Sequence, residues 1–423
     1  SGEAYNGVQV MRPQNLRLDE IRWEKTKSWN VGIYLDIFDG LLQTNLNVYN
    51  KKTSDLLNSG VRIPSSTGFS SLSWANVGDM KNEGWELYAN TRPIFKVGKF
   101  HMVLRGNVAQ NINTVTRMDA SVLASNNADY DYEHANYSYM KRVQIGNALG
   151  GIYGFRYKGV YAYDYDHNGY FTNPEKNQWK DENGQPNTAA ACANERLRRS
   201  TPVVFDANGN VVYDKSGNPL RMVFNYGGIG YEFDGGDAIY EDINHDGQIN
   251  ALDIVYLGNS LPKVQGGFNF TFKYGRWSLK TRFNYRFGNK VVNLARMNLE
   301  NMYTTYNQCA TVNYRWRKDG DITPIPRAMY NAGYNYQASD RFVEDGSYIR
   351  FNNLQLAYNF DKKLIKKLGL NQLQAYLSVN NLYCWTKYSG TDPEVSVAGW
   401  GVAVDDSQTP RAKSFTVTLN VGF

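Results

Sequence analysis

The sequence predicts an all-β fold, an antiparallel transmembrane β-barrel with long loops on one side. Three observations support this prediction. Apolar and polar residues alternate with a period of two in many segments, short turns alternate with very long connections, and aromatic residues make up 14% of the 423 residues although the mean hydropathy is only −0.55. Low hydropathy with many aromatics suits a barrel, because only alternate strand residues face lipid and aromatic girdles mark both interfaces.

The first predicted hairpin lies near the start of the chain. Apolar residues occupy the odd positions from Trp29 to Ile37, and less polar residues occupy the even positions from Thr44 to Val48. An Asp-Gly pair at residues 39–40 lies between the two runs, which is a strong hairpin signal. We therefore expect strands over residues 28–37 and 43–48.

Later segments repeat this pattern. Alternating runs cover residues 100–108, 268–274, 277–287, 373–380 and 414–423, whereas residues 117–145, 160–262, 297–342 and 388–411 form long connections. Connections of this length are uncommon in compact domains unless they are functional loops. The polar faces of the runs carry rows of Asn, Arg and Lys, which suit a water-filled lumen and favour a barrel over a soluble β-sandwich.

One segment has helical character. The residues from Lys362 to Leu368 comprise four lysines and three apolar residues, with Asp361 placed to cap the start of a helix and Gly369 its end. Its position between two predicted strands indicates a short connection on the periplasmic side. We expect a structural role for this helix rather than membrane binding.

Composition narrows the possible classes of function. The formal net charge of +6 is mild for this length and indicates no nucleic-acid partner. The cysteines, Cys192, Cys309 and Cys384, form no CxxC pair, so a metal knuckle or redox pair is not expected. The sequence has no run of about 18 apolar residues, which excludes a membrane helix. The start at Ser1 lacks the pattern of a signal peptide, so we expect the chain to begin within a longer precursor.

Several segments resemble, in order along the chain, the SusC-like (SusC/RagA) family of TonB-dependent transporters of Bacteroidota. The pattern W-E-K-T-x-x-x-N-x-G begins at Trp23, and N-V-G-D-M-K-N-E-G-W-E covers residues 76–86. Residues 151–160, 391–396 and 411–423 are similar to later segments of the family. The resemblance therefore spans nearly the whole chain.

The resemblance implies an outer-membrane barrel of about 22 strands whose lumen is closed by an N-terminal plug. In this family the plug and the TonB box precede the barrel, so we expect residues 1–423 to supply its C-terminal part, with about the last 12 to 14 strands. Such a part cannot close by itself, because open strand edges are unfavourable in lipid.

The resemblance also implies a function and partners. The family imports oligomeric nutrients by energy-coupled transport, with a SusD-like surface lipoprotein as a lid and the TonB-ExbB-ExbD complex acting through the region upstream. Outer-membrane lipid and lipopolysaccharide surround the barrel, and the family suggests a dimer of transporter–lid pairs. Glycan oligosaccharides are the favoured substrate and oligopeptides the next, since no residue in this sequence discriminates between them.

The sharpest local motif lies in the long loop region 160–262. Residues 242–253 read D-I-N-H-D-G-Q-I-N-A-L-D, which is the spacing of a calcium loop. The candidate ligands are Asp242, Asn244, Asp246, the carbonyl of Gln248, Asn250 and Asp253, with Gly247 at the sharp turn. A bound Ca²⁺ would staple the loop rather than take part in catalysis. The alternative is an Asx-rich turn without metal, because Asp, Asn and Gly dominate turns.

Two other functional classes remain as alternatives. The first is a secreted, calcium-binding β-sandwich that serves as an adhesion or binding module. The second is an outer-membrane hydrolase, but the histidines, His101, His134, His167 and His245, do not neighbour a nucleophile motif. We therefore expect no enzymatic activity and no catalytic cofactor. Some loop aromatics could contact substrate, but each is expected to pack the loops more often than to do so. These candidates are Tyr130, Tyr132, Tyr137, Tyr139, Trp179, Tyr303, Tyr306, Trp316, Tyr334, Tyr336 and Trp400.

Overall fold

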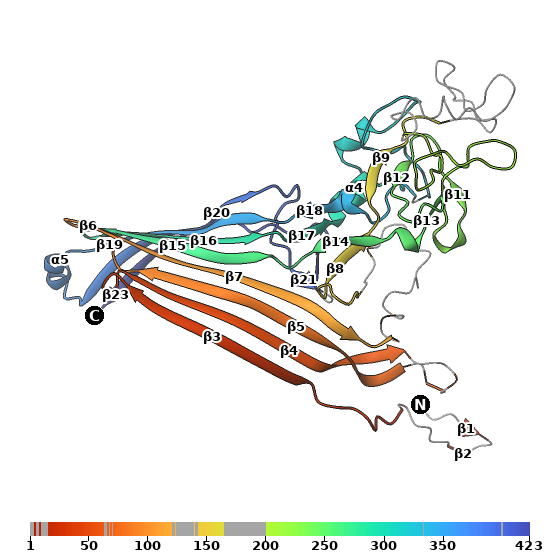
Figure 1. Ribbon diagram of the computed structural model, residues 1–423. Helices are drawn as coiled ribbons and strands as arrows, with labels where there is room; N and C mark the ends of the chain where they lie inside the picture. Colours follow the sequence, from red (N-terminus) through yellow and green to blue (C-terminus); the bar gives the residue numbers. More distant parts are fainter. Residues whose placement is uncertain are drawn as a thin grey trace.

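The computed structural model shows a sheet of long strands and a layer of packed loops at one end of it (Figure 1). It describes residues 16–62, 66, 68–69, 71–120, 123, 139, 143–164, 200–332, 334–398 and 401–423, together with the backbone of residues 4–5 and 8–9. We call residues 143–164, 200–262, 288–347 and 387–413 of this part the loop layer. Among the described residues, no helix is long and apolar enough to cross a membrane.

The sheet contains the long strands that the alternation predicted. Their order in space is β23 (Ser414–Gly422), β20 (Gln372–Thr386), β19 (Tyr348–Asn359), β16 (Trp277–Phe287), β15 (Val264–Tyr274), β7 (Phe100–Met118), β5 (Ser71–Thr91), β4 (Leu42–Arg62) and β3 (Lys25–Ile37), with β6 (Phe95–Val97) beside β7. Neighbouring strands are antiparallel. The order ends at β3 and β23, so the described sheet is an open part of a barrel wall.

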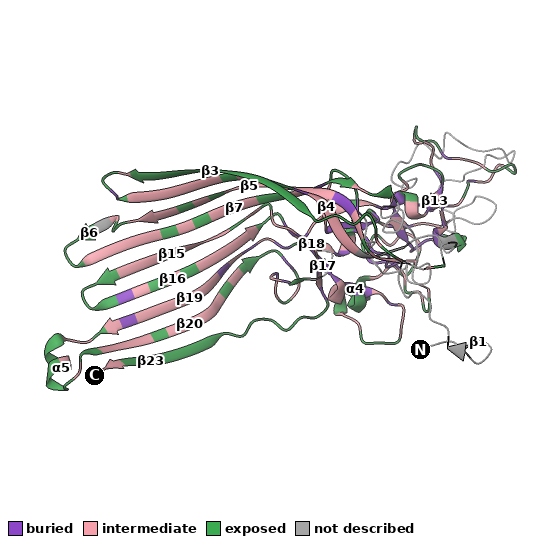
Figure 2. Cartoon of the chain, turned by 90° about the horizontal axis from the view of Figure 1, so that it is seen from below, coloured by how far each residue is buried: buried purple, intermediate pink, exposed green. Residues whose placement is uncertain are grey.

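The strand register sorts side chains onto two faces. Leu377 of β20 lies between Val417 of β23 and Leu356 of β19, whereas the next residue, Ser378, has polar partners on both sides. The apolar face points outward, and Val417 is 80% exposed on it. A face of this kind is stable against lipid, while the opposite, polar face suits a hydrated lumen. Figure 2 shows the exposed and half-buried residues along these strands.

The number of strands differs from our expectation. We expected about 12 to 14 strands, but the sheet in the described part of the chain has 10. One reason is strand length: β4 and β5 are 21 residues each, twice the roughly 9 to 11 residues that a membrane crossing needs. The other reason is that residues 288–347 pack into the loop layer and add no long hairpin.

The loop layer consists of short strands and single helical turns. Along the chain they are β8 (Gly151–Gly154), β9 (Tyr157–Val160), β10 (Val223–Phe224), η2 (Tyr226–Gly228), β11 (Tyr231–Glu232), β12 (Ala238–Tyr240), β13 (Gln248–Ile249), η3 (Ala251–Asp253), β14 (Val255–Asn259), β17 (Lys290–Asn293), η4 (Ala310–Tyr314), η5 (Asp340–Phe342), β18 (Val343–Asp345), β21 (Val397–Ala398) and β22 (Val402–Asp405). A separate pair, β1 (Ala4–Tyr5) and β2 (Val8–Gln9), precedes the sheet.

The loop layer has a hydrophobic core of its own. Tyr153, Phe224, Phe233 and Ile249 are completely buried in one cluster. The Phe233 ring lies edge-on to the Phe224 ring, with 6.3 Å between their centroids. Burying several aromatic side chains together supplies much of the driving force for folding in a small domain. The loop layer is therefore a packed structure, although the sequence predicts only long connections there.

Two α-helices lie in the described part of the chain. α5 (Lys362–Lys367) confirms the predicted helix, and the Asp361 carboxylate accepts a hydrogen bond from the Lys363 backbone N–H. α4 (Leu294–Glu300) was not predicted. Its start is capped by the side chain of Asn293, but its seven residues are too few to give a periodic signal in the sequence.

Candidate functional site

The polar face of the sheet is the first candidate surface. Where β7, β15 and β16 meet, a shallow hollow of about 510 Å³ is bordered by Asn107, Gln265, Arg282 and Arg286. Gly267 keeps the floor of the hollow low, because a Cβ there would lie 2.8 Å from the Phe283 carbonyl oxygen. The hollow thus offers amide and guanidinium groups to whatever occupies the lumen.

This face is also basic. Lys280, Arg282 and Arg286 lie on the same face of β16, with Asn284 between the two arginines. None of the three forms an ion pair with another residue that the structure describes. Nearby on β7, Nε of Arg105 donates a hydrogen bond to the side-chain oxygen of Asn90 at 2.8 Å. The wall therefore presents positive charge that is free to contact a hydrated ligand or an acidic protein surface.

A buried ion-pair network fixes the loop layer around Asp237, which is 0% exposed. Its carboxylate accepts hydrogen bonds from Arg327 Nε at 2.6 Å, from the Tyr231 hydroxyl at 2.6 Å and from Asn335 Nδ2 at 3.1 Å. Arg327 also donates to Asp234 at 3.0 Å. Segments about 90 residues apart in the chain are joined in this way.

The network raises the pKa values of Tyr231 and Arg327. Burial, and then the charge of Asp237, raises the pKa of the Tyr231 hydroxyl above its ordinary value. Burial alone would lower the pKa of the Arg327 guanidinium, but the hydrogen bond and the charge of Asp237 raise it. Both groups therefore keep their protons at all physiological pH values, and the network acts as a structural brace.

A second network joins α4 and β18 to the last long loop. Arg296 donates to Glu300 at 2.9 Å and to Glu344 at 3.1 Å. Glu344 also accepts from the Ser389 backbone N–H at 2.8 Å and from its hydroxyl at 2.7 Å. Burial alone would raise the pKa of Glu344, but these hydrogen bonds and the charge of Arg296 lower it below its ordinary value.

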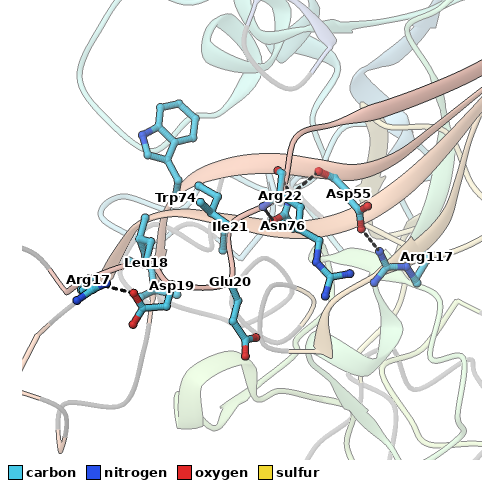
Figure 3. Close-up of a pocket in the computed structure, with 12 residues that line it drawn as sticks. Arg17, Leu18, Asp19, Glu20, Ile21, Arg22, Asp55, Trp74, Asn76 and Arg117 are labelled. Atoms are coloured by element: carbon cyan, nitrogen blue, oxygen red, sulfur yellow. Dashed lines mark hydrogen bonds and ion pairs between the residues drawn. The ribbon is translucent and has the colours of Figure 1, made fainter.

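The motif at residues 76–86 holds the segment that leads into β3. Asn76 accepts from the Arg22 backbone N–H at 2.8 Å and donates to the carbonyl oxygens of Arg22 at 2.8 Å and Asp55 at 2.7 Å. Asp79 binds Arg117 through two hydrogen bonds of 2.9 and 3.1 Å. Figure 3 shows Asn76 beside Arg22 and Asp55, with Arg117 directed at Asp55, around an open pocket of about 570 Å³. The motif thus has a structural role that sequence reasoning missed.

The Asp-rich loop, residues 242–253, brings its first three candidate ligands together. Asp242 accepts from the Gly247 backbone N–H at 2.8 Å and from the Asp246 backbone N–H at 3.3 Å. Asp246 accepts from the Gln248 backbone N–H and from Asn244 Nδ2, at 2.8 and 2.9 Å. Gly247 has a φ of 79°, a left-handed conformation that favours glycine.

The later candidate ligands close the loop. Asp253 is 0% exposed and accepts from the backbone N–H groups of Ile243 and Asn250, both at 2.9 Å. Burial raises the pKa of Asp253 in spite of these hydrogen bonds, and the charges of Asp242 and Asp246 add to the effect. The Asn250 side chain accepts in turn from the Leu252 backbone N–H at 2.8 Å and caps η3.

Gln248 contributes to the loop through its backbone. Its side-chain oxygen accepts from Nδ2 of Asn225, the residue after β10, at 2.5 Å. The carbonyl oxygens of Gly247 and Ile249 also bond to β10. Because carbonyl groups alternate along a strand, the Gln248 carbonyl points away from β10.

In the described part of the chain, no three His, Cys, Asp or Glu side chains form a metal cluster by themselves.

Most of the candidate loop aromatics that the structure describes pack against neighbours. The Tyr334 ring stacks on the Tyr231 ring at 4.1 Å, Tyr336 is 4% exposed, and Trp316 Nε1 donates to the Ala162 carbonyl oxygen. Tyr306, by contrast, is 80% exposed. Five further candidates lie outside the described residues: Tyr130, Tyr132, Tyr137, Trp179 and Trp400.

Comparisons with known proteins agree with this architecture. The family model described as TonB dependent receptor-like, beta-barrel, matches residues 1–210. A TonB-dependent receptor of Formosa agariphila is 30% identical over 434 residues, which cover 100% of this chain and 38% of that protein. TonB-dependent receptor SusC of Bacteroides thetaiotaomicron is 26% identical over 432 residues, covering 100% of this chain and 34% of SusC. The chain thus spans less than two fifths of the length of the curated relatives it matches.

Solved structures share the fold. The RagAB peptide transporter superposes with a TM-score of 0.67 at 20% identity, covering 100% of this chain and 38% of that chain. The RagAB peptide importer in its open-open state gives 0.68 at 18% identity, with 100% and 37% covered. The two-faced antiparallel sheet and these relatives lead to one conclusion: the chain belongs to the TonB-dependent receptors, β-barrel proteins of the outer membrane, and is a relative of SusC.

Proposed function

We propose that this chain takes part in the TonB-dependent import of an oligomeric nutrient across the outer membrane. The observation that supports the proposal most is the two-faced sheet, whose polar face would line a hydrated path toward the loop layer in the closed barrel. Energy coupling through a TonB-ExbB-ExbD complex belongs to the same proposal. The matched relatives extend well beyond this chain, so import is a property of the whole transporter.

We favour glycan oligosaccharides as the substrate and oligopeptides as the second candidate. The hollow in the wall carries Gln265, Arg282 and Asn284, whose side chains donate or accept several hydrogen bonds each, as sugar hydroxyls require. The same groups also suit peptide backbones. RagAB is described as a peptide transporter, which keeps oligopeptides as the alternative.

Uptake by cells that carry the protein at its natural length tests this proposal. We expect labelled oligosaccharides to accumulate only when TonB is present. Arg282→Ser should lower uptake about tenfold, because a charged hydrogen bond contributes about 1.5–3 kcal/mol. Leu279→Met on the apolar face of the same strand is the matched control and should leave uptake unchanged. Accumulation without TonB would contradict import, and TonB-dependent uptake of peptides alone would select the second candidate.

A SusD-like lipoprotein lid is the partner that we propose for the loop layer. Large apolar side chains remain exposed in one segment of this layer: Tyr306 is 80%, Tyr314 76% and Tyr330 70% exposed. Exposed aromatics that gather in one segment are typical of protein interfaces. We also propose a dimer of transporter–lid pairs. Co-purification of the lid should be lost in a Tyr306→Ser/Tyr314→Ser variant and kept in a Tyr274→Ser variant at the opposite end of the sheet.

We propose that the Asp-rich loop holds Ca²⁺ as a structural staple. Hydrogen bonds within the loop join Asp242, Asn244 and Asp246. The alternation of carbonyl groups along the strand directs the Gln248 carbonyl away from β10. These are hard oxygen ligands at the spacing of a calcium loop. Asp253 and Asn250 would complete the set by closing the loop. Bound calcium would offset the repulsion among the three carboxylates and hold the loop against β10.

Hydrogen exchange of residues 240–255 tests the calcium proposal. We expect slower exchange when about 1 mM Ca²⁺ is added, because a ligand that binds only the folded loop stabilises it. The effect should vanish in an Asp242→Asn/Asp246→Asn variant. Asp206→Asn, in a turn of similar composition, should not alter it. Exchange that is equally slow with calcium and with a chelator would reject the site and leave an Asx-rich turn.

A further inference from the structure

The helix α5 differs from the other connections at its end of the sheet. It joins β19 to β20 and lies beside the C-terminus, opposite the loop layer (Figures 1 and 2). At 100° per residue, its side chains separate into two faces. Lys362, Lys363, Lys366 and Lys367 form one face, and Leu364, Ile365 and Leu368 form the other. The helix is therefore amphipathic and strongly basic, with no acidic residue between its caps.

The apolar face of this helix is only partly covered. Ile365 is half-buried, but Leu364 is 41% and Leu368 55% exposed. Two exposed leucines beside four exposed lysines are the composition of a helix that lies in a membrane interface. Lysine side chains reach the headgroups from such a position while their aliphatic stems cover apolar surface.

The helix is also held in a fixed place. Asp361 caps it and forms an ion pair with Arg276 in the turn between β15 and β16. At the other end, the Leu370 backbone N–H donates to the Ile365 carbonyl oxygen at 3.0 Å, and that of Asn371 donates to Gly422 at 2.8 Å. Because both ends are tied to the sheet, α5 presents its lysines in a defined position.

Aromatic residues on the apolar face show where the membrane surface lies. The rings of Trp277 and Tyr358 are 4.6 Å apart, and those of Tyr358 and Phe360 are 5.1 Å apart. Trp and Tyr mark the level of the headgroups in outer-membrane barrels. Phe360 directly precedes Asp361, so α5 begins where this aromatic row ends. The helix is thus continuous with the lipid-facing surface of the sheet.

The sequence led us to expect a structural role for this helix rather than membrane binding, but the exposure of Leu364 and Leu368 favours a different conclusion. We propose that α5 is a binding site for anionic phospholipid headgroups in the periplasmic leaflet of the outer membrane. The four lysines would contact the phosphates, and Leu364 and Leu368 would enter the boundary of the acyl chains. The leaflet is on the periplasmic side because short turns occupy that side in these barrels. The site rests on the membrane location of the sheet and is independent of what the protein imports.

Lipid retention by the full-length protein tests this proposal. The protein would be reconstituted in nanodiscs of phosphatidylethanolamine with about 20% phosphatidylglycerol, which supplies an anionic surface that attracts lysines. The retained lipid would be counted by native mass spectrometry. Each lysine near an anionic surface contributes about fivefold in affinity. Replacing all four lysines by Gln should therefore lower the retention of phosphatidylglycerol at least tenfold.

A charge-matched variant is the control. Replacing four exposed loop-layer lysines by Gln removes the same net charge at the far end of the molecule: Lys215, Lys318, Lys387 and Lys413. This variant should retain as much phosphatidylglycerol as the wild-type protein. A Leu364→Ser/Leu368→Ser variant should retain less phosphatidylglycerol, but the dependence of retention on salt should stay unchanged because the four lysines remain. Heat-modifiable migration in gels confirms that each variant is folded.

Three results would overturn the proposal. One is equal retention by the wild-type protein and by the variant without helix lysines, which would leave α5 as a solvated turn or a contact for a soluble partner. Another is equal loss in both charge variants, which would reduce the effect to net charge. The third is retention that persists at 1 M salt, where the screening length falls to about 3 Å and lysine contacts with headgroups weaken.

Discussion

The sheet and the loop layer place large apolar side chains in opposite environments. Phe415 on β23 is 75% exposed, whereas Phe233 in the loop layer is completely buried. In the sheet, apolar residues face outward and the strands are joined by backbone hydrogen bonds. In the loop layer, apolar residues face inward and ion pairs brace the structure. The difference teaches that one chain is folded for two solvents, lipid around the sheet and water around the loops.

The largest effect should follow from emptying the core of the loop layer. Phe233→Ala removes a ring that contacts several aromatic neighbours, and a buried Phe→Ala change costs about 3–5 kcal/mol. Hydrogen exchange across residues 200–262 should accelerate, while the sheet keeps its heat-modifiable migration. Tyr306→Ala, at an exposed position, should change neither. Loss of the sheet together with the loops would show that the two regions fold as one unit.

A charge on the outer face of the sheet should have the next largest effect. Leu377→Arg places a guanidinium against lipid, at a cost of about 2–4 kcal/mol near the bilayer midplane. Urea unfolding in vesicles should register this loss. Ser378→Arg, one residue along on the polar face, is the matched control and should have little effect. Equal losses for both variants would mean that we have assigned the two faces wrongly.

The junction between the two regions should respond more weakly. Asn76→Ala removes three hydrogen bonds between β5 and the segments around Arg22 and Asp55. We expect a local loss of about 1–3 kcal/mol, because backbone groups are left without these partners. Hydrogen exchange should accelerate in residues 17–24 and remain unchanged in the loop layer. Ser73→Ala on the same strand is the control, and similar acceleration in that variant would refute the role of Asn76.

Acid should lower the stability of the loop layer more than that of the sheet. Of the four effects predicted here, this one should be the smallest. The pKa of Glu344 is lower in the folded protein than its ordinary value of 4.5. A carboxyl group of this kind stabilises the folded state above its unfolded pKa, and the stability is lost as pH falls toward the folded pKa. The loop layer should therefore loosen below about pH 4.5. Glu344→Gln should flatten this dependence in proteolysis assays, whereas Glu232→Gln at the surface should not.

The sheet could be predicted from the sequence in most respects. Alternation identified the strands because side chains in a strand have a period of two, and the register then places like residues side by side. The turn at Asp39-Gly40 and the helix α5 with its Asp361 cap were predicted from local chemistry. Local patterns were sufficient because each of these features depends on residues close together in the chain.

The loop layer could not be predicted in the same way. Asp237 and Arg327 are 90 residues apart, and no local pattern indicates that they meet. α4 was missed because its single cap and seven residues carry little signal. The Asp-rich loop lies between these two cases. Hydrogen bonds join Asp242, Asn244 and Asp246, which are close together in the chain, but the calcium site itself stays a prediction. The roles of Asn76 and Asp79 required the structure, because their partners, Arg22 and Arg117, are far from them in the chain.

The long-range contacts of the loop layer have a consequence for the order of folding. The Asp340 carboxylate accepts from the Tyr157 backbone N–H across 183 residues, and β17 pairs with β22 around the strands β19 and β20. Closing such loops in a free chain is entropically unfavourable and slow. The sheet lowers this cost. Each added hairpin brings the chain back to the end of the sheet where the loop layer lies, so the segments that must meet are already close together. We therefore expect the strands to assemble first and the loop layer to close last, from the membrane outward.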